Sequence, residues 1–208
     1  MKKQIFEKDL QMNTKSVALI AIFSAMAIIL NAIRIPAFYW PGMFYLISDI
    51  PVLVAFLLFG FKIGFLVEAI QILGQEIFFP VGPAGIVFYP MGFFIHLFMF
   101  SGIYLASKFI NRGTASDVRV ETRKATLHFT GFAAFFRGAF MPIIDFGLLY
   151  YVLLPLVLGT AIPLGYIQGL VASFIIYNVT SALYVVPIAY LIAIKTKKHF
   201  RIDPAIKI

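Results

Sequence analysis

Long apolar segments, separated by short polar or proline-rich breaks, make up most of the chain. A helix crosses the roughly 30 Å hydrocarbon core of a bilayer in about 20 apolar residues, and most of these segments approach or exceed that length. The pattern predicts six membrane helices, at residues 16–33, 50–59, 63–79, 85–109, 127–158 and 164–194. The fifth contains Pro142 and Pro155, so we expect it to be kinked or broken.

The breaks between these helices differ in character. Residues 34–47 contain two prolines, a glycine and several aromatic side chains, which predicts an aromatic outer loop at the membrane interface or over a cavity. Tight turns are predicted at residues 60–64, which include Lys62, and at residues 80–83. Residues 111–124 form the only long hydrophilic stretch of the chain and predict an exposed loop or an amphipathic connector.

Composition supports a membrane protein and excludes several kinds of site. The chain has 208 residues, of which 62% are hydrophobic and 12% charged. Soluble domains are about 25% charged, so most of this surface is expected to face something other than water. The net charge of +8 does not indicate nucleic-acid binding, because the spans leave no soluble module to carry it. There is no cysteine, which excludes disulfides, thiolate zinc sites and iron–sulfur clusters.

The placement of charge predicts the orientation of the chain. Of the 17 lysine and arginine residues, all except Arg34 and Arg137 fall on one side of the six-span layout. Because cytoplasmic loops carry the excess of basic residues, both termini are predicted to be cytoplasmic. The predicted organisation is a cytoplasmic segment at 1–15, a six-helix membrane domain at 16–194 and a basic tail at 195–208. The fold class is therefore an all-α, multi-pass protein of the cell membrane, and its first apolar segment is expected to be retained because no signal cleavage site follows it.

Polar side chains inside the spans are the candidate functional residues, because ionisable groups at membrane depth are costly. Glu68, Gln71 and Gln75 share one helical face. This stripe predicts either the polar wall of a ligand pocket, which we favour, or interhelical hydrogen bonding.

The fifth span carries a second stripe, formed by Arg137, Met141 and Asp145. Arg137 is expected to snorkel toward the cytoplasm or to pair with an acid such as Asp145 or Glu68. Asp49 lies near the outer rim at the start of the second span.

Other polar residues allow more than one interpretation. Asn178 and Ser181 lie one turn apart in the sixth span and could line a cavity or bond to a neighbouring helix. Glu76 lies near the outer end of its span and is expected to be structural. His96, alone on an apolar helix, is expected to be a satisfied core residue rather than a switch.

Small residues on the first span suggest a surface for helix packing. Ala21 and Ala25 form a small-x-x-x-small pattern that Ala18 extends by one turn. Such residues let another helix approach closely, either in a partner protein or within the same chain.

Motifs typical of catalysis are absent from the sequence. There is no His-Glu-x-x-His, no Gly-x-Ser-x-Gly and no Gly-x-x-x-x-Gly-Lys motif, and no pair of acids has metal-ligand spacing. We therefore predict a protein without enzymatic activity. Two alternatives stay open, namely a membrane-embedded enzyme that uses Glu68, Asp145, Arg137 and His96, and a structural or assembly protein.

Together these motifs resemble a known family. The chain is similar to the substrate-binding S components of energy-coupling factor (ECF) transporters, and most similar to the riboflavin-type members, over about residues 16–194. The resemblance rests on four segments: Ala21-x-x-x-Ala25, the stretch from Asp49-Ile-Pro51 through Gly60 and Gly64 to Glu68, Arg137-x-x-x-Met141-x-x-x-Asp145, and Tyr177-Asn178.

At two positions this chain departs from the riboflavin-type pattern. Where those members tend to have lysine, it has Gln71 and Ser181. A flavin is the first candidate ligand, and another vitamin or small planar neutral ligand fits the altered residues as well.

The resemblance implies a role and a set of partners. An S component binds a micronutrient from the outer side, joins a transmembrane coupling protein and two cytosolic ATPase subunits that use ATP, and is thought to topple in the membrane to release its ligand inside. The implied substrate-binding residues are Trp40, Tyr45, Asp49, Glu68, Gln71, Asp145, Asn178 and Ser181. The implied docking residues are Ala18, Ala21 and Ala25, and neither a metal nor a catalytic cofactor is expected.

Overall fold

The computed structural model describes residues 14–37, 44–80, 82, 85–110, 118–153, 155–156 and 163–200. Within these ranges it contains six α-helices, one π-helical turn and a two-stranded ribbon. In chain order the elements are α2 (Thr14–Leu30), β1 (Arg34–Pro36), β2 (Phe44–Leu46), α3 (Asp49–Phe59), α4 (Phe61–Phe78), α5 (Gly85–Ile110), α6 (Val118–Leu148), η2 (Leu149–Leu153) and α8 (Leu164–Phe200).

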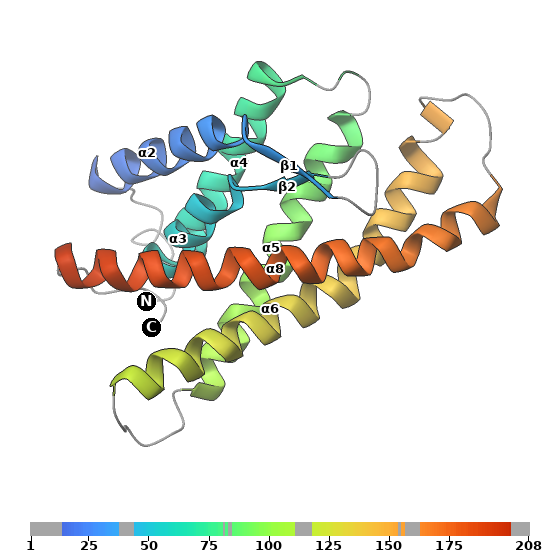
Figure 1. Ribbon diagram of the computed structural model, residues 1–208. Helices are drawn as coiled ribbons and strands as arrows, with labels where there is room; N and C mark the ends of the chain where they lie inside the picture. The colour runs from blue at the N-terminus through green and yellow to red at the C-terminus, as the bar shows by residue number, and fades with distance from the viewer. Residues whose placement is uncertain are drawn as a thin grey trace, which may run out of the picture.

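The helices form one bundle, in which α6 and α8 lie side by side along much of their length (Figure 1). The start of α2, the end of α5 and the end of α8 point toward the left and lower left of the view. The starts of α5 and α8 point the other way, with the ribbon above α8 in the middle of the view. The chain therefore alternates between two ends of the bundle, as a multi-span protein requires.

Three helices are long and apolar enough to cross a membrane by length and composition, at Tyr89–Phe109, Arg123–Val152 and Gln168–Phe200. The apolar helices Thr14–Leu30 and Asp49–Phe59 are shorter. A short apolar helix is more typical of a buried core position than of a free span. This applies to α3, because residues 51–58 are buried on every side of the helix and it packs against α2, α4, α5 and α8.

The turn between α3 and α4 depends on two glycines. Gly60 ends α3 at φ 89°, a conformation that side-chain-bearing residues rarely adopt. One turn later, a Cβ on Gly64 would lie 2.6 Å from Phe56 Cβ and 2.9 Å from Phe56 Cα, so only glycine allows the two helices to approach this closely. The predicted turn at 60–64 is thus shorter than expected, because α4 begins at Phe61.

The all-α prediction was incomplete, because part of the predicted aromatic loop is an antiparallel ribbon. Arg34 lies opposite Leu46, Ile35 opposite Tyr45 and Pro36 opposite Phe44. Pro36 lacks an N–H and is tolerated because the ribbon has only two strands, so both are edges.

The fifth and sixth helices also differ from the prediction. Residues 118–124 were expected in a loop or connector, but they form the first turns of α6. The helix continues through Pro142, and the irregularity comes at η2, a wider turn just before Pro155. At the other end of the chain, α8 extends to Phe200 and includes residues that were assigned to the basic tail.

Candidate ligand-binding site

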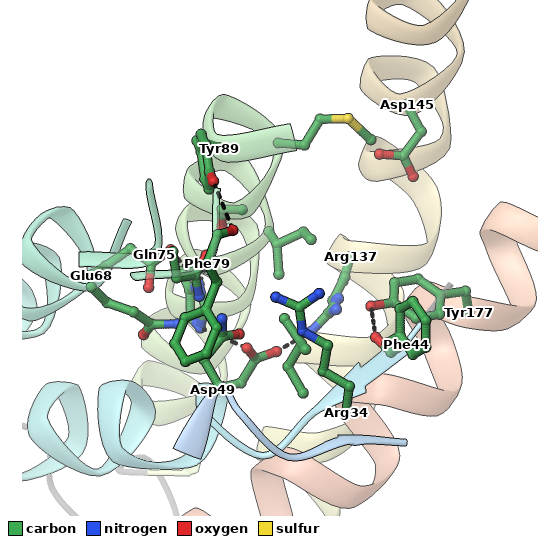
Figure 2. A pocket seen from close by; sticks show the side chains of 17 residues that line it. Arg34, Phe44, Asp49, Glu68, Gln75, Phe79, Tyr89, Arg137, Asp145 and Tyr177 are labelled. Atoms are coloured by element: carbon green, nitrogen blue, oxygen red, sulfur yellow. Dashed lines mark hydrogen bonds and ion pairs between the residues drawn. The ribbon is translucent and has the colours of Figure 1, made fainter. Parts of the chain in front are cut away.

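A cavity of about 280 Å³ lies inside the bundle, beneath the ribbon (Figure 2). Six helices and both strands, or the turns beside them, contribute to its wall. The lining residues are Asn31, Arg34, Phe44, Leu46, Asp49, Glu68, Gln71, Gln75, Phe79, Tyr89, Met91, Gly92, Ile95, His96, Arg137, Asp145 and Tyr177.

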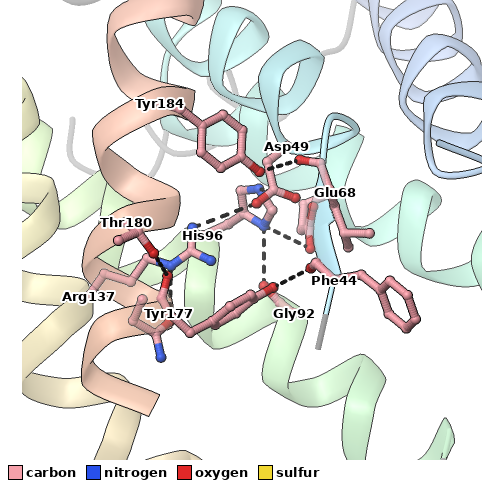
Figure 3. A network of polar contacts seen from close by, with 11 residues as sticks. Phe44, Asp49, Glu68, Gly92, His96, Arg137, Tyr177, Thr180 and Tyr184 are labelled. Carbon is pink, nitrogen blue, oxygen red and sulfur yellow. Dashed lines mark hydrogen bonds and ion pairs between the residues drawn. The ribbon is translucent and has the colours of Figure 1, made fainter. Parts of the chain in front are cut away.

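One side of the cavity holds a histidine between two acids. His96 Nδ1 lies 3.0 Å from Glu68 Oε1 and 3.2 Å from the Gly92 carbonyl oxygen. Both neighbours are acceptors, so Nδ1 carries a proton and donates to them. His96 Nε2 lies 3.9 Å from Asp49 Oδ1. The histidine therefore connects α5 to the start of α3 and to α4 (Figure 3).

On the opposite side, Arg137 is the centre of the polar contacts. It has no exposed surface, and its NH1 lies 3.6 Å from Asp49 Oδ2. Its Nε donates to Asn178 Oδ1 at 3.0 Å, and Asn178 Nδ2 donates to Asp145 Oδ2 at 3.0 Å and to the Phe174 carbonyl oxygen at 2.9 Å. Arginine can only donate and a carboxylate can only accept, so these contacts determine the orientation of the Asn178 amide.

Tyrosines on α8 hold the ribbon over the cavity. Tyr177 donates to the Phe44 carbonyl oxygen at 2.8 Å, and Tyr184 donates to the Leu46 carbonyl oxygen at 2.9 Å (Figure 3). Between them, the Tyr45 ring stacks on Tyr177 at 5.4 Å, and its hydroxyl lies 2.6 Å from Thr180 Oγ1. β2 is therefore attached to α8 through both its backbone and its one central side chain.

Several buried polar atoms of the wall have no hydrogen-bond partner among the described residues. They include Glu68 Oε2, Gln71 Oε1, His96 Nε2 and Arg137 NH1. Buried polar groups are normally paired, because an unmade hydrogen bond costs about 1–3 kcal/mol. A polar ligand or water in the cavity would pair them.

The predicted substrate-binding residues fall into three groups. Asp49, Glu68, Gln71 and Asp145 line the cavity. Tyr45, Asn178 and Ser181 do not line it: Tyr45 secures the ribbon, Asn178 lies behind the wall between Arg137 and Asp145, and Ser181 is buried on α8. Trp40 lies outside the described residues.

The predicted site left out Arg34, His96 and Arg137, which all line the cavity. Arg137 was expected to snorkel or to pair with an acid such as Asp145 or Glu68, but its ion pair is with Asp49 and it is connected to Asp145 through Asn178. His96 was expected to be a satisfied core residue, and it is buried and hydrogen-bonded, yet it also faces the cavity. Arg137 and His96 could have been included from the sequence, because both are ionisable groups at membrane depth.

The three alanines of α2 are exposed, and the polar residues of α4 differ in their exposure. Ala18, Ala21 and Ala25 are exposed on α2, and the buried face of that helix is formed by Ile20, Ser24 and Ala27. On α4, Gln75 lines the cavity and Glu76 is exposed. In the part of the chain that the structure describes, no group of three or more His, Asp or Glu side chains could hold a metal ion.

Comparisons with known proteins identify the family. The profile of the family described as "ECF transporter, substrate-specific component" matches residues 15–202. Comparison with curated proteins gave no match. A solved structure described as "Structure and mechanism of the S component of a bacterial ECF transporter" matches with a TM-score of 0.59 and 23% identity, covering 90% of this chain and 97% of that chain. At that identity the structural match shows the fold alone, and it confirms the S-component fold expected from the sequence. Because the family profile spans nearly all of the sequence, the chain belongs to the substrate-specific S components of ECF transporters, which are embedded in the membrane and bind the transported substrate.

Proposed function

We propose that this chain is the binding subunit of an importer for a vitamin or a similar small micronutrient. A flavin is the first candidate because the sequence is most similar to riboflavin-type members. The observation that carries the proposal is the cavity of about 280 Å³, which contains charged side chains inside an otherwise apolar bundle. That volume lies near the lower end of the roughly 300–1,000 Å³ typical of ligand sites, so the ligand is small.

The position of the cavity supports entry from the outer side. By the distribution of basic residues, the turn at Lys62 and the end of α8 face the cytoplasm. The cavity lies beneath the ribbon that joins the outer end of α2 to α3, opposite those elements. In this arrangement all six α-helices lie within the membrane and both termini face the cytoplasm. The ribbon is the part that opens to admit the ligand.

The chain is proposed to act with partners rather than by itself. Its sequence contains no phosphate-binding Gly-x-x-x-x-Gly-Lys motif, so the ATP that drives import is used by two cytosolic ATPase subunits, joined through a transmembrane coupling protein. The exposed alanines of α2 (Ala18, Ala21 and Ala25) are the proposed docking surface for that coupling protein.

Ligand identification tests the proposal directly. Protein purified in mild detergent is expected to carry a small molecule that mass spectrometry of the denatured extract identifies, and calorimetry against the water-soluble vitamins, riboflavin included, is expected to give one saturable ligand. Binding of none of them contradicts the proposal. Chemical turnover of a small molecule by the isolated chain would favour the membrane-embedded enzyme instead.

A further inference from the structure

The buried part of the cavity has an excess of acids. Asp49, Glu68 and Asp145 are each buried and line it, against a single buried arginine, Arg137. Arg34 lies at the exposed rim, where its guanidinium sits 5.7 Å from the centre of the Phe79 ring. The remaining titratable side chain of the buried wall, His96, is already a donor to Glu68.

Several donors in the wall already have acceptors. Arg137 donates to Asn178 and faces Asp49, and His96 Nδ1 donates to Glu68 and Gly92. Asn178 uses its amide hydrogens on Asp145 and Phe174. Arg137 NH1 has no hydrogen-bond partner among the described residues, so it is a donor left for a carbonyl oxygen or ring nitrogen of a ligand.

Two neighbouring acceptors also remain available on one face of α4. Glu68 Oε2 and Gln71 Oε1 have no hydrogen-bond partner among the described residues, although both side chains are at least 98% buried and line the cavity. The two residues are one helical turn apart, which places their side chains next to each other. A ligand that donates two neighbouring N–H groups would satisfy both atoms.

The space beside Glu68 suits a flat ring. A Cβ built on Gly92 lies 3.7 Å from Glu68 Oε1, in ordinary contact, so the absence of a side chain there leaves room beside the carboxylate. Phe44, Phe79, Tyr89 and Tyr177 contribute aromatic surfaces to the same cavity (Figure 2). Aromatic rings stack well on planar heterocycles.

From these observations we infer that the transported ligand is a planar nitrogen heterocycle with an amino group beside a ring N–H, and that Glu68 and Gln71 accept those two hydrogens. The inference rests on the proposed function, since it takes this cavity as the site of the transported ligand. It changes the first candidate, because the pyrimidine edge of a flavin presents a single N–H between two carbonyl oxygens. That N–H can pair with only one of the two acceptors, and a carbonyl oxygen would then face the other, which is unfavourable in a buried site.

A matched pair of probes tests the inference on the unmodified protein. Pterin and lumazine share a bicyclic ring and differ at one position, where pterin has an amino group and lumazine a carbonyl oxygen. Calorimetry or intrinsic ligand fluorescence is expected to show that pterin binds more tightly than lumazine, by at least about tenfold, because lumazine places a carbonyl oxygen where pterin offers its second donor and leaves one acceptor unpaired. Riboflavin is measured alongside and is expected to bind more weakly than pterin.

A pair of variants connects the preference to Glu68. Glu68→Gln is expected to reduce the ratio of pterin to lumazine affinity by about tenfold, because the new amide accepts at only one atom and donates at the other. Glu76→Gln, the same change on the exposed side of the same helix, is expected to leave the ratio unchanged. Gln71→Leu, which removes the second acceptor without adding charge, is expected to lower pterin affinity more than lumazine affinity. Both affinities are measured on one sample, so a loss of folded protein cancels in the ratio.

The outcomes separate this inference from the proposed function. Equal or tighter binding of lumazine or riboflavin, failure of pterin to bind while another vitamin binds, or an unchanged ratio in Glu68→Gln overturns the inference and leaves the import function standing. Binding of no probe and of no water-soluble vitamin overturns the proposed function itself.

Discussion

Asn178 bonds to a neighbouring helix. It lies outside the cavity wall, yet its amide connects the buried Arg137 to Asp145 and joins α6 to α8. This bonding is one of the two interpretations that its position in the sequence allowed. Interhelical hydrogen bonds in membrane proteins average only about 0.6 kcal/mol, but bonds to charged partners that would otherwise be buried unpaired are worth more. Asn178 therefore contributes to ligand binding by positioning Arg137 and Asp145.

Replacing Asn178 with leucine, which has a similar size and no polar atoms, tests this role. We expect Asn178→Leu to lower the free energy of unfolding by about 2–4 kcal/mol, because Arg137 Nε and Asp145 Oδ2 both lose a partner. Thermal unfolding in detergent measures the effect. Gln168→Leu, at an exposed position of the same helix, should change stability little, and an equal loss in both variants would refute the assignment.

At the scale of elements, the α3–α4 hairpin gives the bundle its central packing. Gly60 supplies the backbone conformation of the turn and Gly64 the close approach to Phe56. With α4 held this close to α3, Glu68 lies one turn beyond Gly64 on the same helix and faces the cavity.

Gly64→Ala should therefore destabilise the protein. The added methyl group would overlap the Phe56 backbone, which cannot move aside as a flexible side chain does, and overpacking of this kind costs about 1–3 kcal/mol. Chemical or thermal unfolding measures the loss. Gly147→Ala is the control, since it lies in α6 with open space around the new Cβ and should be neutral or stabilising by up to about 1 kcal/mol. Similar behaviour of the two variants would show that close approach is not what Gly64 provides.

The ribbon is attached to α8 by tyrosine hydroxyls, so removing them should loosen it. The double variant Tyr177→Phe/Tyr184→Phe keeps both rings and loses the two bonds to the Phe44 and Leu46 carbonyl oxygens. At about 1 kcal/mol for each bond, ligand dissociation is expected to accelerate by about 10- to 30-fold, as stopped-flow displacement would measure. Tyr151→Phe, at an exposed tyrosine of η2, should leave the rate unchanged, whereas an unaltered rate in the double variant would mean that the ribbon does not control ligand exit.

At the scale of the whole molecule, the orientation in the membrane can be tested because the chain contains no cysteine. Single cysteines introduced by Ala32→Cys, beside the ribbon, and Lys198→Cys, near the end of α8, lie at exposed positions. A membrane-impermeant maleimide should label the first in intact cells and the second only after permeabilisation, because the basic residues place the end of α8 inside. The reverse result would contradict the proposed topology.

The alanine surface of α2 can be distinguished from ordinary lipid-facing surface by a functional assay. Ala21→Trp/Ala25→Trp should leave ligand binding by the isolated chain intact and abolish ATP-driven uptake in cells that contain the partner subunits, because bulky side chains prevent close helix approach. Ala139→Trp, at an exposed alanine of α6, should leave both unchanged. Loss of ligand binding in the double variant would mean that this surface packs within the chain, and normal uptake would mean that it faces lipid.

The periodicity and the charge pattern of the sequence were sufficient to predict the helices of this protein. Apolar segment length and the breaks at proline and glycine located all six α-helices of the described residues, because the bilayer requirement is local and one-dimensional. The start of α6 at Val118 was missed, because a hydrophilic sequence can be a solvated helix end as well as a loop. The ribbon was missed as well, because its strands have three residues each and depend on contacts with α8.

The sequence alone determined that the chain is an apolar helical protein, that its costly polar residues cluster on a few helix faces, and to which family it is similar. Helical spacing is sufficient to place Glu68 with Gln71 and Arg137 with Asp145. Only the tertiary structure decided which of these faces meet and what each group pairs with. Arg137 contacts Asp49 and Asn178, His96 joins the cavity, and two acceptors on α4 are left without partners. The physical reason is that pairing depends on how helices distant in sequence pack and rotate against each other, which the 3.6-residue repeat of a single helix does not specify.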